Sequence, residues 1–263
     1  MIYYIAEFEA LGCEAEFYLN DVPVARARKE EPYHGRPVNH LLLPGRNALM
    51  LASCLGPAPS SARSAHAPVA IEPGATSASA KLWRLPAGGF PRDPGSELVC
   101  QLQWTPGAPL TLAKANEDVA LFELPQDVPV PRWTQCEPLP KDFAAQAAAV
   151  MRALRESLSA HDPEPFIRMA RSRFEDCAAA FGIDLAQDIE GFRQQLAEQS
   201  AAVFEPFDEA AFDPRPVGGG RLVDCQDHSW RSPLRTTPDS KGAVKLSYQT
   251  RIGRLNGEWR IVL

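Results

Sequence analysis

The stretch from Lys141 to Phe204 constrains the fold most, because it carries a long, repeated and punctuated helical pattern. Apolar residues recur at helical spacing in three consecutive runs, and capping or helix-breaking residues separate the runs. The first run ends before Asp162-Pro163, which supplies an N-cap and a residue suited to the first helical position. Gly182 is suited to close the second run, and the third begins near Asp184. The pattern predicts three helices of about 15–20 residues each.

The residues before this stretch have the pattern of short strands separated by turns. Pro-, Gly- and Ser-rich segments lie between the strands, and the longest, Gly56–Pro68, is predicted to be mobile. Asn20-Asp21 predicts a turn between two strands. This punctuation predicts a β-sandwich. The expected strands are Ile2–Glu9, Glu14–Leu19, Val38–Leu43, Ala48–Ser53, Ser79–Leu85, Leu98–Trp104 and Val119–Leu124.

The residues after the helical stretch are expected to form an antiparallel sheet. A loop over Phe204–Gly220 precedes a candidate strand at Arg221–Trp230, and alternation from Val244 to Ile252 predicts another. Asn256-Gly257 is a strong signal for a type I′ hairpin turn. The chain should then return as a strand that contains Trp259 and Ile261.

A chain of 263 residues favours two domains, and its composition suggests where they divide. Residues 125–140 hold five prolines and no helical period, which is typical of a semi-rigid connector. The sequence therefore predicts a β-sandwich domain at residues 1–130, a Pro-rich linker at 131–140 and an α+β domain at 141–263.

Composition and cysteine usage bear on the compartment. The chain is 45% hydrophobic and 23% charged, as is usual for a soluble globular protein, and none of the three predicted helices is apolar enough to cross a membrane. Its first residues lack a basic leader before an apolar core. The six cysteines form no C-x-x-C pair, so buried free thiols are expected, together with a cytoplasmic location. No cofactor is predicted.

Three helices followed by a curved antiparallel sheet that ends in Leu255-Asn256-Gly257-Glu258-Trp259-Arg260-Ile261 resemble the NTF2-like (cystatin-like α+β) family. The resemblance covers residues 142–263. It implies three helices packed on the sheet around a cone-shaped pocket that can hold a carboxylate paired with His or Tyr for proton abstraction. The candidates for that chemistry are Asp224, Asp227, His228 and Tyr248. The alternative is that these are polar residues on the exposed face of the sheet.

Other candidate sites are less specific. Tyr18–Val24 followed by Leu43–Asn47 resembles the strand and turn arrangement of jelly-roll or carbohydrate-module-like sandwiches. Trp83 and Trp104 could then bind carbohydrate, although burial in the sandwich core is the better interpretation. His34 and His40 could form a metal pair or simply be solvated. The chain has no P-loop, dinucleotide fingerprint, nucleophile elbow or zinc-protease motif.

Charge is distributed unevenly in the C-terminal half. Residues 175–213 hold ten acidic residues against one basic residue, whereas residues 214–263 hold nine basic against four acidic. One interpretation is intramolecular neutralisation of the basic sheet by the acidic helices. The other is an acidic surface that docks a basic protein, which also argues against nucleic-acid binding. The candidate partner-binding residues are Glu190, Glu198, Glu205, Asp208, Glu209 and Asp213.

A motif-poor, acidic, two-domain chain without a leader resembles bacterial immunity proteins, particularly those that guard against nuclease toxins delivered by type VI secretion. That resemblance implies a non-catalytic cytoplasmic protein that binds a basic toxin directly. A secretion adaptor or chaperone would have the same features. The alternative from a different class is an NTF2-like enzyme or small-molecule-binding protein that uses the C-terminal cone.

Overall fold

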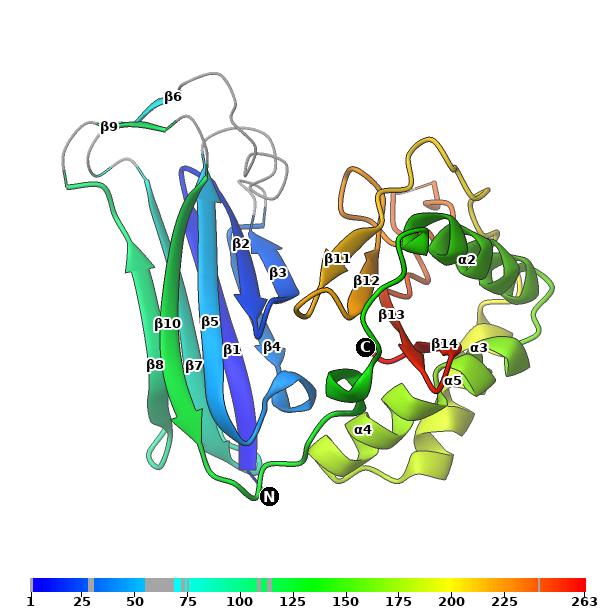
Figure 1. Cartoon of the computed structure of the whole chain (residues 1–263), viewed down its shortest axis with the longest axis horizontal. Helices are drawn as coiled ribbons and strands as arrows, with labels where there is room; N and C mark the ends of the chain where they lie inside the picture. Colours follow the sequence, from blue (N-terminus) through cyan, green and yellow to red (C-terminus); the bar gives the residue numbers. More distant parts are fainter. Residues whose placement is uncertain are drawn as a thin grey trace. The chain divides into compact units, whose positions relative to one another are not determined.

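The computed structural model describes residues 2–27, 31–54, 69–71, 74, 76–107, 110–112, 115–240 and 242–263. The chain divides into two compact units, which meet in sequence between Val130 and Pro131 (Figure 1). The described part is a mixed α/β structure with three four-stranded antiparallel sheets, one two-stranded sheet and four α-helices. The Gly56–Pro68 loop predicted to be mobile lies outside the described residues.

The first unit contains two four-stranded sheets that lie face to face (Figure 1). Their strand orders are β4-β1-β7-β8 and β10-β5-β2-β3, and β6 pairs with β9. The strands are β1 (Ile2–Leu11), β2 (Glu14–Leu19), β3 (Val22–Ala27), β4 (Tyr33–Pro37), β5 (Gly45–Cys54), β6 (Val69–Ile71), β7 (Ser77–Pro86), β8 (Glu97–Trp104), β9 (Leu110–Leu112) and β10 (Asn116–Leu124).

Alternating apolar residues on β1 and β2 fill the core between these two sheets. Tyr4, Ala6 and Phe8 on β1 are buried. Phe8 stacks on Phe17 of β2, with ring centroids 4.5 Å apart, so the two rings join one sheet to the other. The hairpin between β2 and β3 is confirmed, because Asn20 and Asp21 both adopt positive φ, at 53° and 63°. A type I′ turn requires that conformation at both central positions.

The strand predicted at Val38–Leu43 is wrong. Residues Asn39–Leu41 form a 3₁₀ helix, η1, and β4 pairs with β1 in its place. The physical reason is the side chain of Asn39, which accepts a hydrogen bond from Tyr4 N at 2.8 Å and donates to Ile2 O at 2.9 Å. Such side-chain bonds to the backbone compete with a regular ladder.

The second unit packs its helices against one four-stranded sheet, in the order β11-β12-β13-β14 (Figure 1). Its helices, which are followed in sequence by the strands, are α2 (Phe143–Ser159), α3 (Glu164–Met169), α4 (Arg171–Phe181) and α5 (Leu185–Glu198). The strands are β11 (Arg215–Val217), β12 (Leu222–Cys225), β13 (Thr250–Leu255) and β14 (Glu258–Ile261).

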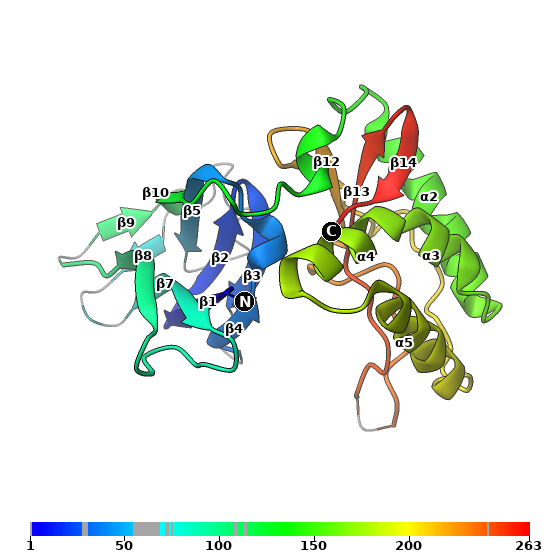
Figure 2. The same cartoon turned by 90° about the horizontal axis from the view of Figure 1, so that it is seen from below.

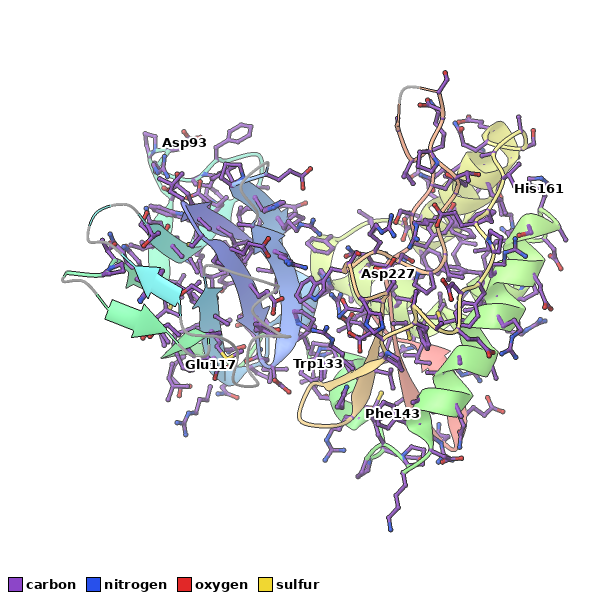
Figure 3. The ribbon with its side chains drawn as sticks, turned by 90° about the horizontal axis from the view of Figure 1, so that it is seen from above. Asp93, Glu117, Trp133, Phe143, His161 and Asp227 are labelled. Carbon is purple, nitrogen blue, oxygen red and sulfur yellow. The ribbon has the colours of Figure 1, made fainter. Side chains whose placement is uncertain are left out.

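The helical prediction was right in its first and third runs and wrong in its second. Phe143 begins α2, and His161, just beyond its end, has φ 55°. Figure 3 labels both residues, near the two ends of α2. The second run forms two helices, because the chain turns at Ala170 between α3 and α4. Ala170 is completely buried, so the turn brings the backbone against the core, where only a small side chain fits.

Two predicted strands are shorter than expected. The strand expected at Arg221–Trp230 ends at Cys225, because the carboxylate of Asp227 accepts hydrogen bonds from the backbone of Ser229 and Arg231 and folds the chain into a turn. The alternation from Val244 to Ile252 becomes a regular strand only at Thr250. The hairpin at Asn256-Gly257 is confirmed, with φ values of 53° and 79°.

Residues 131–140, predicted as a linker, pack against the second unit. They include a 3₁₀ helix, η2 (Arg132–Gln135). Trp133 and Cys136 are buried, and the backbone of Glu137 donates to Arg254 O at 2.8 Å. A Cβ atom added at Gly253 would lie 2.5 Å from the sulfur of Cys136, so the close approach of this segment to β13 requires glycine there.

Candidate functional site

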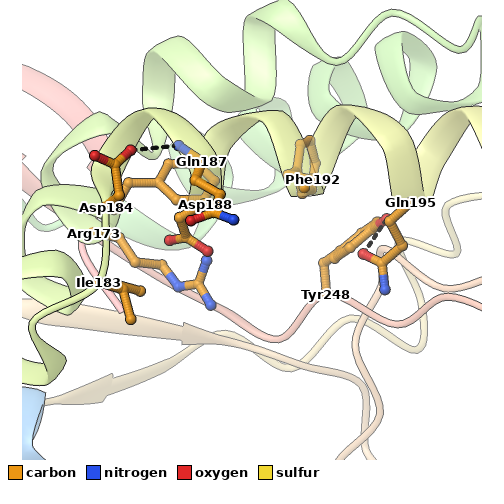
Figure 4. Close-up of a pocket in the computed structure, with 10 residues that line it drawn as sticks. Arg173, Ile183, Asp184, Gln187, Asp188, Phe192, Gln195 and Tyr248 are labelled. Atoms are coloured by element: carbon orange, nitrogen blue, oxygen red, sulfur yellow. Dashed lines mark hydrogen bonds between the residues drawn. The ribbon is translucent and has the colours of Figure 1, made fainter.

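A pocket with a volume of about 580 Å³ lies on helices α4 and α5 (Figure 4). The two helices contact each other and are neighbours in Figure 2. Its size is in the range of ligand-binding pockets in proteins. Apolar and charged residues both contribute, and Tyr248 reaches it from the segment before β13. The lining residues are Arg173, Phe174, Ile183, Asp184, Gln187, Asp188, Gly191, Phe192, Gln195 and Tyr248.

The connection between α4 and α5 places the charged residues at one end of the pocket. Gly182 adopts the left-handed conformation, with φ 63°, and ends α4. Asp184 then caps α5, since its carboxylate accepts a hydrogen bond from Gln187 N at 2.8 Å. The sequence predicted the end of one helix at Gly182 and the start of the next near Asp184. As Figure 4 shows, Asp184 and Asp188 follow one another along α5 near the side chain of Arg173.

Aromatic rings form the apolar wall of the pocket. Phe192 stacks on Phe166 with centroids 4.7 Å apart and lies 5.3 Å from the ring of Tyr248. The edge of Phe174 faces Phe192 at 6.1 Å. Because Phe166 is buried beneath these rings, the wall is part of the core of the second unit.

Tyr248 is held in this wall as a neutral phenol. Its hydroxyl donates a hydrogen bond of 3.5 Å to Gln195 Oε1. Burial raises the pKa of Tyr248 to about 12, because the phenolate would lose its hydration. The phenol is therefore protonated near neutral pH and can act there as a hydrogen-bond donor.

The phenol of Tyr248 is expected to titrate at about pH 12, above its ordinary value of 10.0. Stability should therefore fall as the pH rises through that interval, because the unfolded chain loses the proton first. Ultraviolet absorbance can follow phenolate formation in the native protein and in Tyr248→Phe. A difference curve between the two proteins with a pKa near 10 would contradict the burial of this phenol.

The charges at the pocket suit a cationic, partly apolar group. Asp184 is exposed and Asp188 is half-buried, and within the described residues neither makes an ion pair. The guanidinium of Arg173 lies 5.8 Å from the ring centroid of Phe174, within the range of a cation–π contact. A lysine or arginine side chain can place its methylene stem on the aromatic wall and its charge near these carboxylates.

The six candidate partner-binding residues lie outside this pocket, on α5 and in the loop that follows it. Most of them make ion pairs within the second unit: Glu190 with Arg193, Glu205 with Arg235, Glu209 with Arg152, and Asp213 with Arg215. Asp208 accepts from the backbone of Ala210 and Ala211. Glu198 is exposed near the end of α5.

A second pocket, of about 440 Å³, brings Glu205 and Asp208 together with Asp227 and Arg235. Arg235 pairs with Glu205 at 2.6 Å and with Asp227 at 3.0 Å, and its side chain is only 12% exposed. The carboxylate of Asp227 is thus used to hold the loop after β12, and Glu205 is used to hold Arg235. The two ion pairs of Arg235 therefore neutralise part of the acidic excess within the second unit.

The candidate catalytic residues do not converge. Asp224 is buried on β12 and pairs with Arg251 at 3.0 Å, while Asp227 pairs with Arg231 and Arg235. His228 is exposed, 3.6 Å from Asp213. Tyr248 lines the pocket on α5. Each carboxylate of this set already has arginine partners, and none faces Tyr248 across a shared cavity of the described residues.

Side chains fill the space between α2 and the sheet. Met151 and Leu154 of α2 are buried in the same cluster as Val223 and Ile252 of the sheet. The hydroxyl of Thr250 donates to the sulfur of Met151 at 3.4 Å. These side chains form a packed core between α2 and the sheet.

The remaining candidates of the first unit lie on four different elements, β4, η1, β7 and β8. Trp104 is buried, as expected, whereas Trp83 is only partly buried, and its indole donates to Glu7 Oε2 at 2.6 Å. His34 lies on β4 and His40 on η1. In the part of the chain that the structure describes, no three His, Cys, Asp or Glu residues gather as a metal site.

Five cysteines with described side chains form no disulfide: Cys13, Cys100, Cys136, Cys177 and Cys225. Cys13, Cys136 and Cys225 are buried, as predicted, and the other two are half-buried. The side chain of Cys54 lies outside the described residues. Burial raises the pKa of Cys136 to about 12, so this thiol is inert at neutral pH.

The spacing of three residues in the sequence indicates the pocket on α5, although the distribution of charge does not. Asp184, Asp188 and Phe192 follow one another at intervals of four residues, which places them along one side of a helix. Tyr248 and Arg173 come from other segments, and no local pattern connects them to α5.

The comparisons with known proteins do not assign this chain to a family. No protein-family model, no curated protein and no solved structure matches it. Among the described helices, none combines the length and the apolar character needed to span a membrane.

Proposed function

We propose that this protein is a non-catalytic binding module that docks a basic protein through α5, with the pocket of Figure 4 as its anchor. One observation carries the proposal: an aromatic wall of Phe192 and Tyr248 stands beside the carboxylates of Asp184 and Asp188 in a single pocket. Central pockets that take up one long side chain dominate the binding energy of many protein interfaces.

Exposed acidic residues around the pocket support a partner of positive charge. Glu190 and Glu198 are exposed on α5, and Asp184 is exposed at its N-terminal end. Attraction between an acidic surface and a basic partner accelerates association and sets specificity more than it adds affinity. Because Glu190, Glu205 and Asp213 are engaged with Arg193, Arg235 and Arg215, Glu198 on α5 should contribute more than these three residues.

The proposal includes the biological role suggested by the sequence. In that role the protein is a bacterial immunity protein that neutralises a basic, nuclease-type toxin effector of type VI secretion in the cytoplasm. A secretion adaptor or chaperone would use the same surface. The roles differ in one outcome: a toxin partner arrests growth when expressed alone, and co-expression of this protein restores growth.

We further propose that the first unit is a β-sandwich and that the second unit has an NTF2-like fold. The helices that precede the sheet in sequence and the closing hairpin at Asn256-Gly257 support this assignment. The filled space around Met151 and Val223 weighs against the alternative of an enzyme or small-molecule-binding cone. It favours a protein whose binding surface lies on the outside of its helices.

The test is affinity capture from the native host at low salt, with the tagged full-length protein as bait. Wild type is expected to capture one basic protein in stoichiometric amount and to release it near 0.5 M salt, where the screening length falls to about 4 Å. The double variant Asp188→Asn, Glu198→Gln should weaken binding of that protein at least about tenfold, mainly by slower association at low salt.

The matched control removes the same charge from the first unit, in Glu117→Gln, Glu123→Gln on β10. This control should bind as wild type does. If both double variants weaken binding equally, the effect comes from the net charge of the protein and not from α5. Capture of no basic protein, or undiminished binding by the α5 variant, would reject the proposal.

A further inference from the structure

A third pocket in the second unit, of about 660 Å³, is rich in arginine. It lies among η2, the α3–α4 connection and the β13–β14 hairpin, away from the acidic helix α5. Leu255 is the only apolar residue of its lining. The lining residues are Arg132, Gln135, Arg168, Arg171, Ser172, Glu175, Leu255, Asn256, Glu258 and Arg260.

Two glutamates hold three of the four guanidinium groups in place. Glu175 pairs with Arg132 and with Arg171, the latter at 2.8 Å, so one carboxylate keeps two guanidiniums side by side. Glu258 pairs with Arg260, two residues further along β14. Arg132 Nε also lies 3.7 Å from Asp176 Oδ1, just outside the lining. Each guanidinium carries five N–H groups, so those that face neither a carboxylate nor Arg168 O can donate to a ligand.

Arg168 and Arg260 complete the cationic side of the pocket. The guanidinium of Arg260 also donates to Arg168 O at 3.5 Å, which ties β14 to the end of α3. In the described ranges the side chain of Arg168 makes no ion pair. The lining contains four arginines and two glutamates, so the formal charge of the lining residues is +2.

We propose that this pocket binds a small, hydroxyl-rich molecule that carries phosphoryl groups, of the sugar phosphate class. Guanidinium groups recognise phosphate oxygens through paired, charge-assisted hydrogen bonds. Ser172, Gln135 and Asn256 offer neutral partners for hydroxyl groups. None of the described residues that line the pocket is aromatic, so these residues offer no stacking surface for a nucleobase.

The volume supports a ligand larger than an inorganic ion. About 660 Å³ falls within the range of pockets for small molecules and exceeds what one phosphate group fills. The same phosphorylated, hydroxyl-rich chemistry occurs free in solution and on lipid headgroups, so the experiment has to separate these two sources.

Isothermal titration calorimetry of the full chain tests the proposal with fructose bisphosphate, inorganic phosphate and glucose as soluble probes. Fructose bisphosphate is expected to bind, inorganic phosphate to bind more weakly, and glucose not to bind. A parallel arm measures sedimentation with vesicles that contain phosphatidylinositol phosphate. Binding to these vesicles but not to fructose bisphosphate would support the site and identify a lipid headgroup as its ligand.

Variants locate the binding in this pocket. Arg168→Gln and Arg260→Gln should each weaken the binding by about tenfold or more, the effect of removing one charge-assisted contact. Arg84→Gln in the first unit is the control, because Arg84 also forms an exposed pair, with Glu97 at 3.3 Å, and should bind as wild type does. Circular dichroism verifies that each variant is folded.

Two results would overturn the proposal. One is the absence of binding in both arms. The other is equal affinity of Arg168→Gln, Arg260→Gln and Arg84→Gln for the probe that binds. Neither result depends on whether α5 docks a protein, because the pocket shares no residue with α5.

Discussion

Replacing Phe166 with alanine is expected to destabilise the second unit by about 3–5 kcal/mol, as for large aromatic residues truncated in a core. Phe166 is 2% exposed and its ring stacks on Phe192. The ring of Tyr248 lies 5.5 Å away on another side. Deleting the phenyl group would leave a cavity that α3 and α5 can close only in part, because both are fixed by neighbouring apolar contacts.

The measurement is urea denaturation of the full chain, followed by the fluorescence of tryptophan. Because the chain has two units, the transition of the second has to be resolved before a free energy is assigned to it. Phe90→Ala is the matched control: Phe90 is 70% exposed, and this change should cost less than about 0.5 kcal/mol. Equal free energies of unfolding for both variants would show that Phe166 does not support the helical core.

The same variant connects the core to the candidate binding pocket. Phe166 supports both Phe192 and Tyr248, which form the apolar wall of the pocket. Burial is the cause of the raised pKa of Tyr248, so loosening this wall should return that pKa toward 10.0 in any variant that remains folded. The titration of the phenol thus reports the packing of the wall independently of any ligand.

The parts of the fold that the sequence predicted well are those in which a local residue choice determines the backbone. Asn256-Gly257 and Asn20-Asp21 adopt positive φ, which few residue types accept, so their turns can be located from sequence. Gly182 ends α4 and Asp184 begins α5 for similarly local reasons. In these places the sequence specifies the backbone within a few residues.

Two of the errors arose where a polar side chain bonds to backbone groups and so replaces a regular strand. Asn39 bonds to the backbone of β1, some 35 residues away, and converts an expected strand into η1. Asp227 captures nearby backbone groups and also Arg235, and so ends β12 early. Hydrophobic alternation cannot reveal these bonds, because it records which residues are apolar and not which polar groups meet.

The candidate site also has a part that the sequence predicts and a part that depends on the tertiary fold. The spacing of Asp184, Asp188 and Phe192 on a helix could be read from the sequence, whereas Tyr248 reaches them only through the tertiary fold. The acidic excess could be counted, but its pairing could not. Glu205 and Glu209 are engaged with Arg235 and Arg152, so a count of charges overstates the acidity that the surface presents to a partner.

Arg251→Met is expected to destabilise the second unit by about 3–5 kcal/mol, because it leaves a buried carboxylate without its partner. Arg251 Nε lies 3.0 Å from Asp224 Oδ1, and both side chains are at most 15% exposed. Gln226, with its amide nitrogen toward Asp224, donates to the second carboxylate oxygen at 3.1 Å. That amide cannot replace the positive charge of the guanidinium.

Urea denaturation of three variants separates the cost of the unpaired charge from the value of the pair. Asp224→Leu, Arg251→Met removes both charges and should lie much closer to wild type than Arg251→Met does. Arg84→Met breaks an exposed pair with Glu97 in the first unit and should change little. If the double variant is as unstable as Arg251→Met, the loss of Arg251 acts through its packing and not through the charge of Asp224.

The pH dependence gives an independent test of the same cause. Burial raises the pKa of Asp224, while the nearby guanidiniums of Arg251 and Arg215 act in the opposite direction. Removing Arg251 should therefore raise this pKa further, so ionised Asp224 costs more in the folded variant than in the folded wild type. That cost is present above the ordinary aspartate pKa and disappears below it, where the carboxyl is protonated in both folded and unfolded chains. The difference in unfolding free energy between wild type and Arg251→Met should accordingly be largest near neutral pH and shrink as the pH falls toward 4.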